Sequence, residues 1–179
     1  KVFWKLDADL AYQRHFPAIN WLSSYSLYLD TLETWFNSNV NEEWMATRQN
    51  LMTLLQEEAS LNEIVKMVGM DALSPQDRLK MEAARSIRED LLHQNSFDDI
   101  DTYTSINKQF RMMKLVYAFY EEGAKALSEG VKIDKLVKLG VREQIGRFKY
   151  IAEDKVEDQY KIVNDELIHA ISSLKGKED

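Results

Sequence analysis

The 179-residue chain contains no cysteine, only two prolines and only six glycines. Without cysteine it can form neither disulfide bonds nor thiolate zinc sites, and it has no cysteine nucleophile. The scarcity of glycine and proline argues against many short strands joined by tight turns. Together with 45% hydrophobic and 30% charged residues, it favours long helices around one core. We therefore expect an all-α fold.

Other missing features limit the function. No apolar run approaches the roughly 20 residues that span a bilayer, so we expect no direct membrane insertion. The net charge of -7 argues against a nucleic-acid partner, which would require clustered lysine and arginine. Neither a G-x-x-x-x-G-K-[ST] nor a G-x-G-x-x-G pattern occurs, so the chain lacks the usual glycine-rich loops that hold phosphate groups.

The first residues differ in pattern from the rest of the chain. Val2 to Leu6 is short, aromatic and β-prone, with nothing nearby to pair with, which indicates an orphan strand. Asp7 is placed to cap a short helix over residues 8–14, which Pro17 would end. The chain also opens inside an apolar run at a lysine, so we expect a fragment. Residues 1–26 would be the end of one domain and residues 27–179 a helical bundle.

From about Leu27 onward, apolar residues recur with helical spacing. Ser74 followed by Pro75 is a sharp helix start, and Gly69 is a typical helix end, so residues 70–73 should form the tip of a helical hairpin. The sequence predicts helices over about 29–36, 41–69, 74–94, 106–130, 134–139, 142–151 and 153–174, with Asn41 as a cap and a frayed tail over 175–179.

The three histidines are the first candidates for metal chemistry. Asp90-x-x-His93 and Glu166-x-x-His169 resemble half of a di-iron motif. Helical geometry turns His93 and His169 away from the apolar stripes of their helices, so we expect both to face solvent or a partner and expect no metal site. His15 has no recognisable nucleophile nearby and should have a packing or capping role.

Other candidate residues also have an ordinary structural interpretation. The acidic run 98–101 could bind a cation but is more typical of a solvated loop or a helix cap. Phe16, Phe97 and Tyr103 fall in irregular connectors, where they either pack the loops or sandwich a planar ligand. Methionines in the helical segments are expected to fill the core: Met45, Met52, Met67, Met81, Met112 and Met113.

Several segments together resemble one protein family. The opening block Phe3-Trp4-Lys5-Leu6-Asp7, continuing through Arg14-His15-Phe16-Pro17-Ala18-Ile19-Asn20-Trp21, is the most specific. Residues 24–28, 69–74, 88–97, 101–103 and 119–121 extend the similarity over essentially the whole chain. The sequence resembles the catalytic A (alpha) subunits of A-type and V-type rotary ATP synthases and ATPases.

This resemblance implies a C-terminal helical domain, preceded by the last strand and helix of an α/β nucleotide-binding domain. The family couples ATP hydrolysis or synthesis to rotation of a central stalk and to proton or sodium transport. Its phosphate loop, magnesium ligands and catalytic glutamate lie upstream, so the chain should have no catalytic residue and no tightly bound ATP or ADP. Expected partners are the B subunits of an alternating hexamer and the central stalk, in a cytoplasmic head peripheral to the membrane.

The resemblance also suggests site residues. Phe16, in its Phe-Pro-Ala context, matches the aromatic residue that stacks on adenine, and Phe97 and Tyr103 match the other side of that pocket. The segment at the hairpin tip occupies the place of an acidic hairpin that contacts the stalk in the related F-type β subunit. It has fewer carboxylates than that hairpin. Its candidate stalk contacts are Asp71, Leu73, Ser74, Pro75, Gln76 and Asp77. The alternative is a free-standing helical adaptor that binds another protein through its methionine-rich and aromatic surfaces.

Overall fold

The computed structural model describes residues 1–175 and is all-α apart from one two-stranded sheet. The expected all-α class is therefore confirmed. Of the expected frayed tail, only Lys175 is described, and residues 176–179 lie outside the described part. Among the described residues, none of the helices combines the length and hydropathy that a membrane span requires.

The longest helices are α3 and α5, which supply much of the core. In chain order the elements are β1 (Val2–Phe3), α1 (Ala8–Tyr12), β2 (Tyr25–Ser26), α2 (Leu29–Asn39), α3 (Trp44–Val68), η1 (Met70–Ala72), α4 (Pro75–Ser86), η2 (Ile87–Leu92), α5 (Ile106–Ser128), α6 (Ile133–Val137), α7 (Val141–Arg147), η3 (Phe148–Tyr150), η4 (Glu153–Lys155) and α8 (Val156–Ser172).

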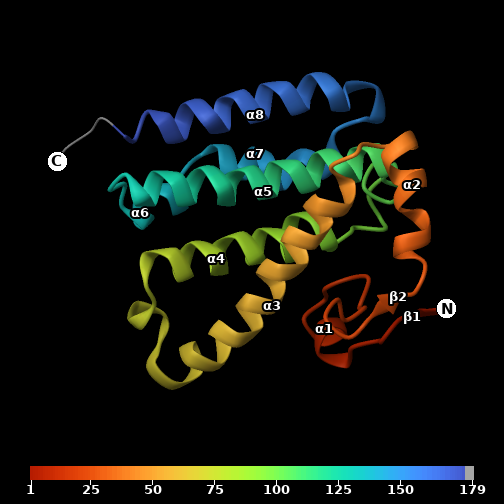
Figure 1. Cartoon of the computed structure of the whole chain (residues 1–179), viewed down its shortest axis with the longest axis horizontal. Coiled ribbons are helices and arrows are strands. Elements are labelled where there is room, and N and C mark those ends of the chain that lie inside the picture. Colours follow the sequence, from red (N-terminus) through yellow and green to blue (C-terminus); the bar gives the residue numbers. More distant parts are fainter. Residues whose placement is uncertain (176–179) are drawn as a thin grey trace.

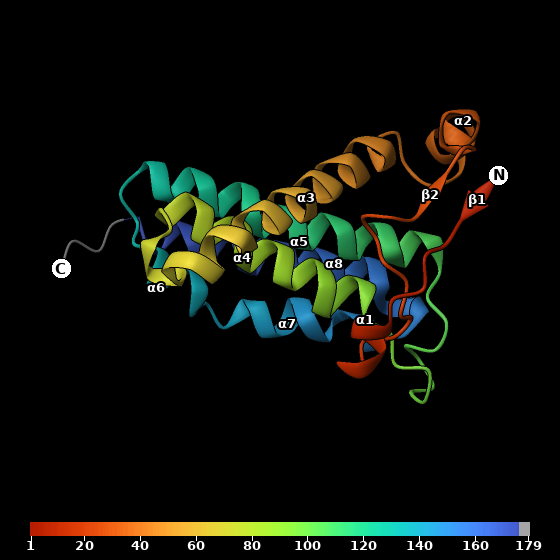
Figure 2. The same cartoon turned by 90° about the horizontal axis from the view of Figure 1, so that it is seen from below.

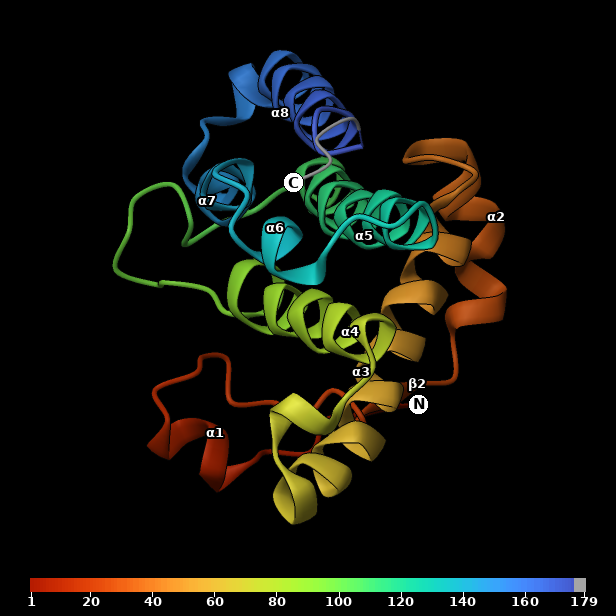
Figure 3. The same ribbon diagram turned by 90° about the vertical axis from the view of Figure 1, so that its left-hand side faces the viewer.

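Helix α5 lies at the centre of the bundle (Figure 1), between α8 on one side and α4 on the other. Seen end-on, α4, α5 and α8 run in similar directions, and α3 crosses them (Figure 3). The N-terminal strands, α1 and the second connector, which joins η2 to α5, lie at the same end of the bundle, with the strands on the side of α2 (Figure 2). Leu79, Leu115, Leu136 and Leu167 fill the interior with no exposed surface.

Local sequence signals set the helix ends. The Ser74 hydroxyl accepts the Asp77 N–H at 3.1 Å and donates to the Asp77 carboxylate at 2.8 Å, so both residues take part in the cap. Gly69 ends α3 with a φ of 86°, a backbone conformation that favours glycine. Asn41 does not cap α3 directly, because the helix begins at Trp44, but its side chain accepts the Glu43 N–H at 2.9 Å.

Two expectations about the chain need correction. The strand at the N-terminus is shorter than expected and is paired: Val2 lies opposite Ser26 and Phe3 opposite Tyr25 in an antiparallel ribbon. The chain turns back on itself through the first connector, which supplies the partner strand. Met67 does not fill the core, because 77% of its surface is exposed near the hairpin tip.

The helix after Ser74 also changes type. The sequence predicts a regular helix to residue 94, but residues 87–92 form a π-helix, η2, whose last bond runs from the His93 N–H to the Arg88 carbonyl at 2.9 Å. Lys149, far along the chain, donates to the Glu89 carbonyl at 3.0 Å and to the His93 carbonyl at 2.8 Å. The widened helix end is therefore stabilised by a tertiary contact.

Asp90 is the titratable group of η2 that is held away from water. Its carboxylate accepts the Ser86 hydroxyl, and burial raises its pKa despite the nearby Lys149 ammonium. The Asp90 carboxylate needs the space beside Gly146, because a Cβ at residue 146 would lie 2.9 Å from it.

The Ser74 cap gives a prediction about stability. Ser74→Ala removes both hydrogen bonds with Asp77 and should lower the free energy of unfolding by about 1 kcal/mol. Urea denaturation followed by circular dichroism measures the change. Ser128→Ala is the control. The Ser128 hydroxyl lies at the C-terminal end of α5, where it donates to the Lys125 carbonyl and caps no N–H group. An equal loss in both variants would contradict the capping argument.

The raised pKa of Asp90 gives a second prediction. The folded state holds the Asp90 proton at a higher pH than the unfolded state, whose pKa is near 3.8. Wild type should therefore lose stability relative to Asp90→Asn as the pH rises from this value through the folded pKa. Asp98→Asn should show the opposite sign, because backbone N–H groups lower the pKa of Asp98. The Asp98 difference develops below pH 3.8 and the Asp90 difference above it, so urea melts on both sides of this pH measure them. A flat Asp90 difference would contradict the assignment.

Candidate functional site

The two aromatic connectors meet at the C-terminal end of η2. The Gln94 N–H donates to the Phe16 carbonyl at 2.7 Å, which joins the second connector to the first. The His15 ring donates through Nε2 to the Arg88 carbonyl at 2.8 Å, and it packs against Trp21. The expected packing role of His15 is confirmed, and the junction is the best-defined candidate site in the described residues.

His93 belongs to the same junction, which corrects its expected position. It is half-buried, and its ring lies edge-on to that of His15 with centroids 5.3 Å apart. Burial lowers the pKa of His93, and the nearby Lys149 ammonium lowers it further. His169 is exposed, as expected. No group of three or more histidine and carboxylate side chains within residues 1–175 could hold a metal ion.

The acidic run of the second connector organises the backbone of its own loop. Asp98 accepts the N–H groups of Ile100 and Asp101 at 2.9 and 2.8 Å. The buried carboxylate of Asp101 accepts the Asn95 N–H at 2.7 Å, and the Asp101 carbonyl accepts the Gln94 side-chain amide at 2.7 Å. The structure supports the structural interpretation of this run over a cation site, although its carboxylates cap backbone N–H groups of the loop and not a helix end.

The three aromatic residues expected at an adenine pocket remain accessible. Phe16 is 50% exposed, Tyr103 74% and Phe97 97%. Their connectors are joined through the Gln94–Phe16 backbone hydrogen bond, but none of the ring pairs among the described residues includes any of the three. The connectors therefore present aromatic rings that the described chain leaves half or more exposed.

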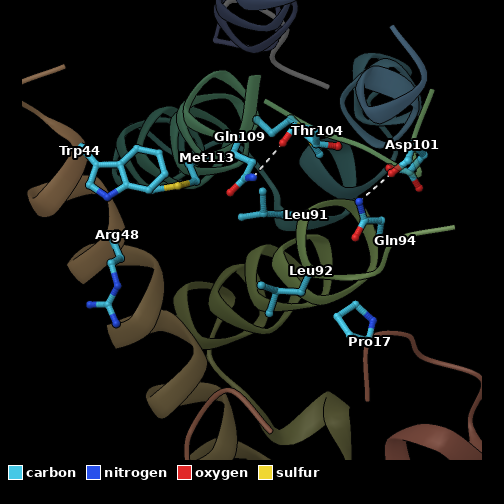
Figure 4. Close-up of a pocket in the computed structure, with 11 residues that line it drawn as sticks. Pro17, Trp44, Arg48, Leu91, Leu92, Gln94, Asp101, Thr104, Gln109 and Met113 are labelled. Carbon is cyan, nitrogen blue, oxygen red and sulfur yellow. Dashed lines mark hydrogen bonds between the residues drawn. The ribbon is translucent and has the colours of Figure 1, made fainter. Parts of the chain in front are cut away.

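A pocket of about 330 Å³ lies between α3, η2, α5 and the two connectors (Figure 4). Trp44 and Arg48 come from α3, and most of the remaining wall is apolar. None of the three exposed aromatics lines it; its walls are Pro17, Trp44, Arg48, Leu91, Leu92, Gln94, Asp101, Thr104, Gln109, Met112 and Met113. The pocket was not predicted from the sequence. Its one local signal is that Trp44 and Arg48 are four residues apart, a spacing that places both on one helix face.

The hairpin tip presents a different surface from the one expected. Leu73 is only 9% exposed, so it is unsuited to reach a partner. Asp77 is occupied by the Ser74 cap and lies 3.7 Å from the Lys80 ammonium, whereas Asp71 is exposed. The accessible side chains around the tip include the ion pair of Glu63 and Lys66 and four apolar residues: Ile64, Met67, Val68 and Met70.

Comparison with known proteins matches the sequence to a family. The profile of the family described as the C-terminal domain of V and A type ATP synthase matches residues 33–137, more than half of the chain. The V-type ATP synthase alpha chain of Acetivibrio thermocellus is 57% identical over 178 residues, covering 99% of this chain and 30% of the relative.

Other relatives carry the same description. The alpha chain of Clostridium botulinum is 55% identical over 177 residues, covering 99% of this chain and 30% of that protein. That of Thermoanaerobacter pseudethanolicus is 59% identical over 156 residues, covering 87% of this chain and 26% of that protein. The chain thus spans about 30% of the length of the first of these relatives. It belongs to the family of C-terminal domains of V- and A-type ATP synthases.

Proposed function

We propose that this domain serves the alpha subunit as one wall of an adenine pocket and as a lever that contacts the central stalk. The observation that carries the proposal is the Gln94–Phe16 hydrogen bond of 2.7 Å. It joins two connectors with exposed aromatic rings at one end of a continuous α4–η2 helical segment, whose other end is the hairpin tip.

The adenine wall consists of Phe16 on the first connector and Phe97 and Tyr103 on the second. Stacking of a base on an aromatic side chain contributes about 1–3 kcal/mol. Because the sequence contains no glycine-rich phosphate loop, the chain would hold the base without the phosphates. In the proposed whole subunit, ATP or ADP with magnesium would be held mainly by the upstream domain, which would supply the catalytic residues.

The lever consists of α3, the tip and the α4–η2 segment. That segment spans roughly 25 Å at about 1.5 Å per residue or slightly less, with the tip at one end and the connectors at the other. Because few carboxylates are free at the tip, the contact with the stalk depends mainly on shape and on the exposed apolar side chains. Asp71, Ser74, Pro75 and Gln76 are exposed and would form the edge of this contact, with Asp71, Ser74 and Gln76 as its polar members.

The N-terminal ribbon supports the proposed division into residues 1–26 and 27–179. Trp4, Leu6 and Tyr12 are largely exposed there, and clustered apolar exposure of this kind marks a surface that another domain covers. We assign it to the upstream nucleotide-binding domain. The whole subunit would assemble with B subunits in a hexamer and would couple ATP hydrolysis or synthesis to rotation and to proton or sodium transport.

A titration tests the adenine wall. Adenosine monophosphate added to the isolated chain should shift the amide signals of Phe16, Phe97 and Tyr103 in NMR spectra, with a Kd in the millimolar range. Phe16→Ala should weaken this binding about fivefold or more, because one stacked ring is lost. Phe3→Ala, which removes another exposed ring of the ribbon, should leave the Kd unchanged.

Two results of the same experiment would contradict the proposed adenine wall. One is the absence of any chemical-shift change at about 20 mM adenosine monophosphate, since a Kd of that size corresponds to a binding free energy of only about −2 kcal/mol. The other is an equal effect of both substitutions. Micromolar ATP binding or magnesium-dependent ATP hydrolysis by the isolated chain would instead show that it contains a phosphate site of its own.

A second experiment tests the lever. Met67→Asp places a charge on the apolar tip and should weaken binding of the assembled alpha subunit to its stalk about tenfold, because roughly one buried side chain's free energy is lost. Ile162→Asp is the control, since Ile162 is an exposed apolar residue on α8, away from the tip. Co-purification of the stalk at increasing dilution measures the effect, and equal retention by both variants would rule out the tip contact.

A further inference from the structure

A chain of contacts links the helical hairpin to the aromatic connector. Glu58 on α3 is only 5% exposed, and its carboxylate accepts two hydrogen bonds from the Arg88 guanidinium, at 2.8 and 3.2 Å. The carbonyl of Arg88 accepts the His15 Nε2–H at 2.8 Å. Residue 15 directly precedes Phe16, so three side chains connect α3 to the proposed base-stacking ring.

Each contact in this chain restricts the next. The paired hydrogen bonds between guanidinium and carboxylate fix the orientation of Arg88 as well as its distance from Glu58. The Arg88 carbonyl already accepts the His93 N–H at 2.9 Å, so its direction is set by the end of η2. The other ring nitrogen of His15, Nδ1, is buried with no hydrogen-bond partner. The Arg88 carbonyl is therefore the polar group that holds the His15 ring in place.

We propose that Glu58 and Arg88 are positioning residues that hold Phe16 where a base can stack, so that α3 of the lever controls the affinity of the adenine site. The inference rests on the proposed adenine wall. Neither residue would touch the nucleotide. A displacement of α3 would pull on Arg88 and move the end of η2 that carries its carbonyl. The His15 ring and Phe16 would move with it, which gives the lever and the pocket a mechanical connection.

The neighbouring glutamate provides a matched control. Glu57 lies next to Glu58 on α3 and forms an ion pair with Lys80 at 3.3 Å. Among the described residues, the ion-pair partner of Arg88 is Glu58 and not Glu57. Glu58→Gln and Glu57→Gln change the same kind of side chain by the same substitution on the same helix. Arg88→Lys is a second test variant, since it retains the charge but loses the paired geometry.

The experiment uses the isolated chain and two readouts. The first is hydrogen exchange of the Gln94 amide, which donates to Phe16, compared with the core amide of Leu115. The second is the Kd for adenosine monophosphate. Glu58→Gln and Arg88→Lys should each speed Gln94 exchange relative to Leu115 and raise the Kd about three- to tenfold, as expected for coupled sites. Glu57→Gln should change neither.

The possible results separate the two proposals. If wild type does not bind the nucleotide, the adenine wall is wrong, and the exchange of Gln94 alone decides whether Glu58 positions the connector. If Gln94 and Leu115 accelerate together in the test variants, the ion pair is only a general stabiliser and the positioning role is wrong. If the nucleotide binds and both test variants match Glu57→Gln in both readouts, the link from α3 to Phe16 is likewise overturned.

Discussion

The junction of the connectors depends on a buried lysine ammonium group at the end of η2. Lys149 donates to the carbonyls of Glu89 and His93, where a helix end carries partial negative charge. Its own backbone carbonyl accepts the fully buried ammonium of Lys108 at 2.7 Å. Burial lowers the pKa of both lysines. Because the carbonyls compensate the cost of burying charge, they fix α5, η3 and η2 relative to one another.

This arrangement explains which parts of the fold the sequence could predict. The start at Ser74 and the end at Gly69 follow from residues within one turn, so both were predictable. The π-helix was not, because the group that stabilises its end, Lys149, lies about one third of the chain away. In the sequence, Lys149 looks like a surface residue, because lysine is rarely buried. Only the tertiary structure shows that it is buried.

The same distinction applies to the site. Phe16, Phe97 and Tyr103 could be found because aromatic residues in connectors stand out, and their exposure is consistent with a binding surface. Leu73 could not be assigned correctly, since a leucine in a short turn between helices packs inward or outward according to the angle between those helices. The N-terminal pairing was also missed because it depends on the return of the first connector, which has no short-turn signal.

A lever must resist bending, and the α4–η2 segment has the properties that this requires. Its N-terminal end is capped by Ser74, and Lys149 donates to two carbonyls at its C-terminal end, so side chains hold both ends. Between them Leu79, Ala83 and Ala84 have no exposed surface, and a close-packed interior deforms little. A force at the tip would then shift the segment as a unit against α3. The Glu58–Arg88 ion pair spans the interface between this segment and α3. The motion would therefore reach the connector through this ion pair.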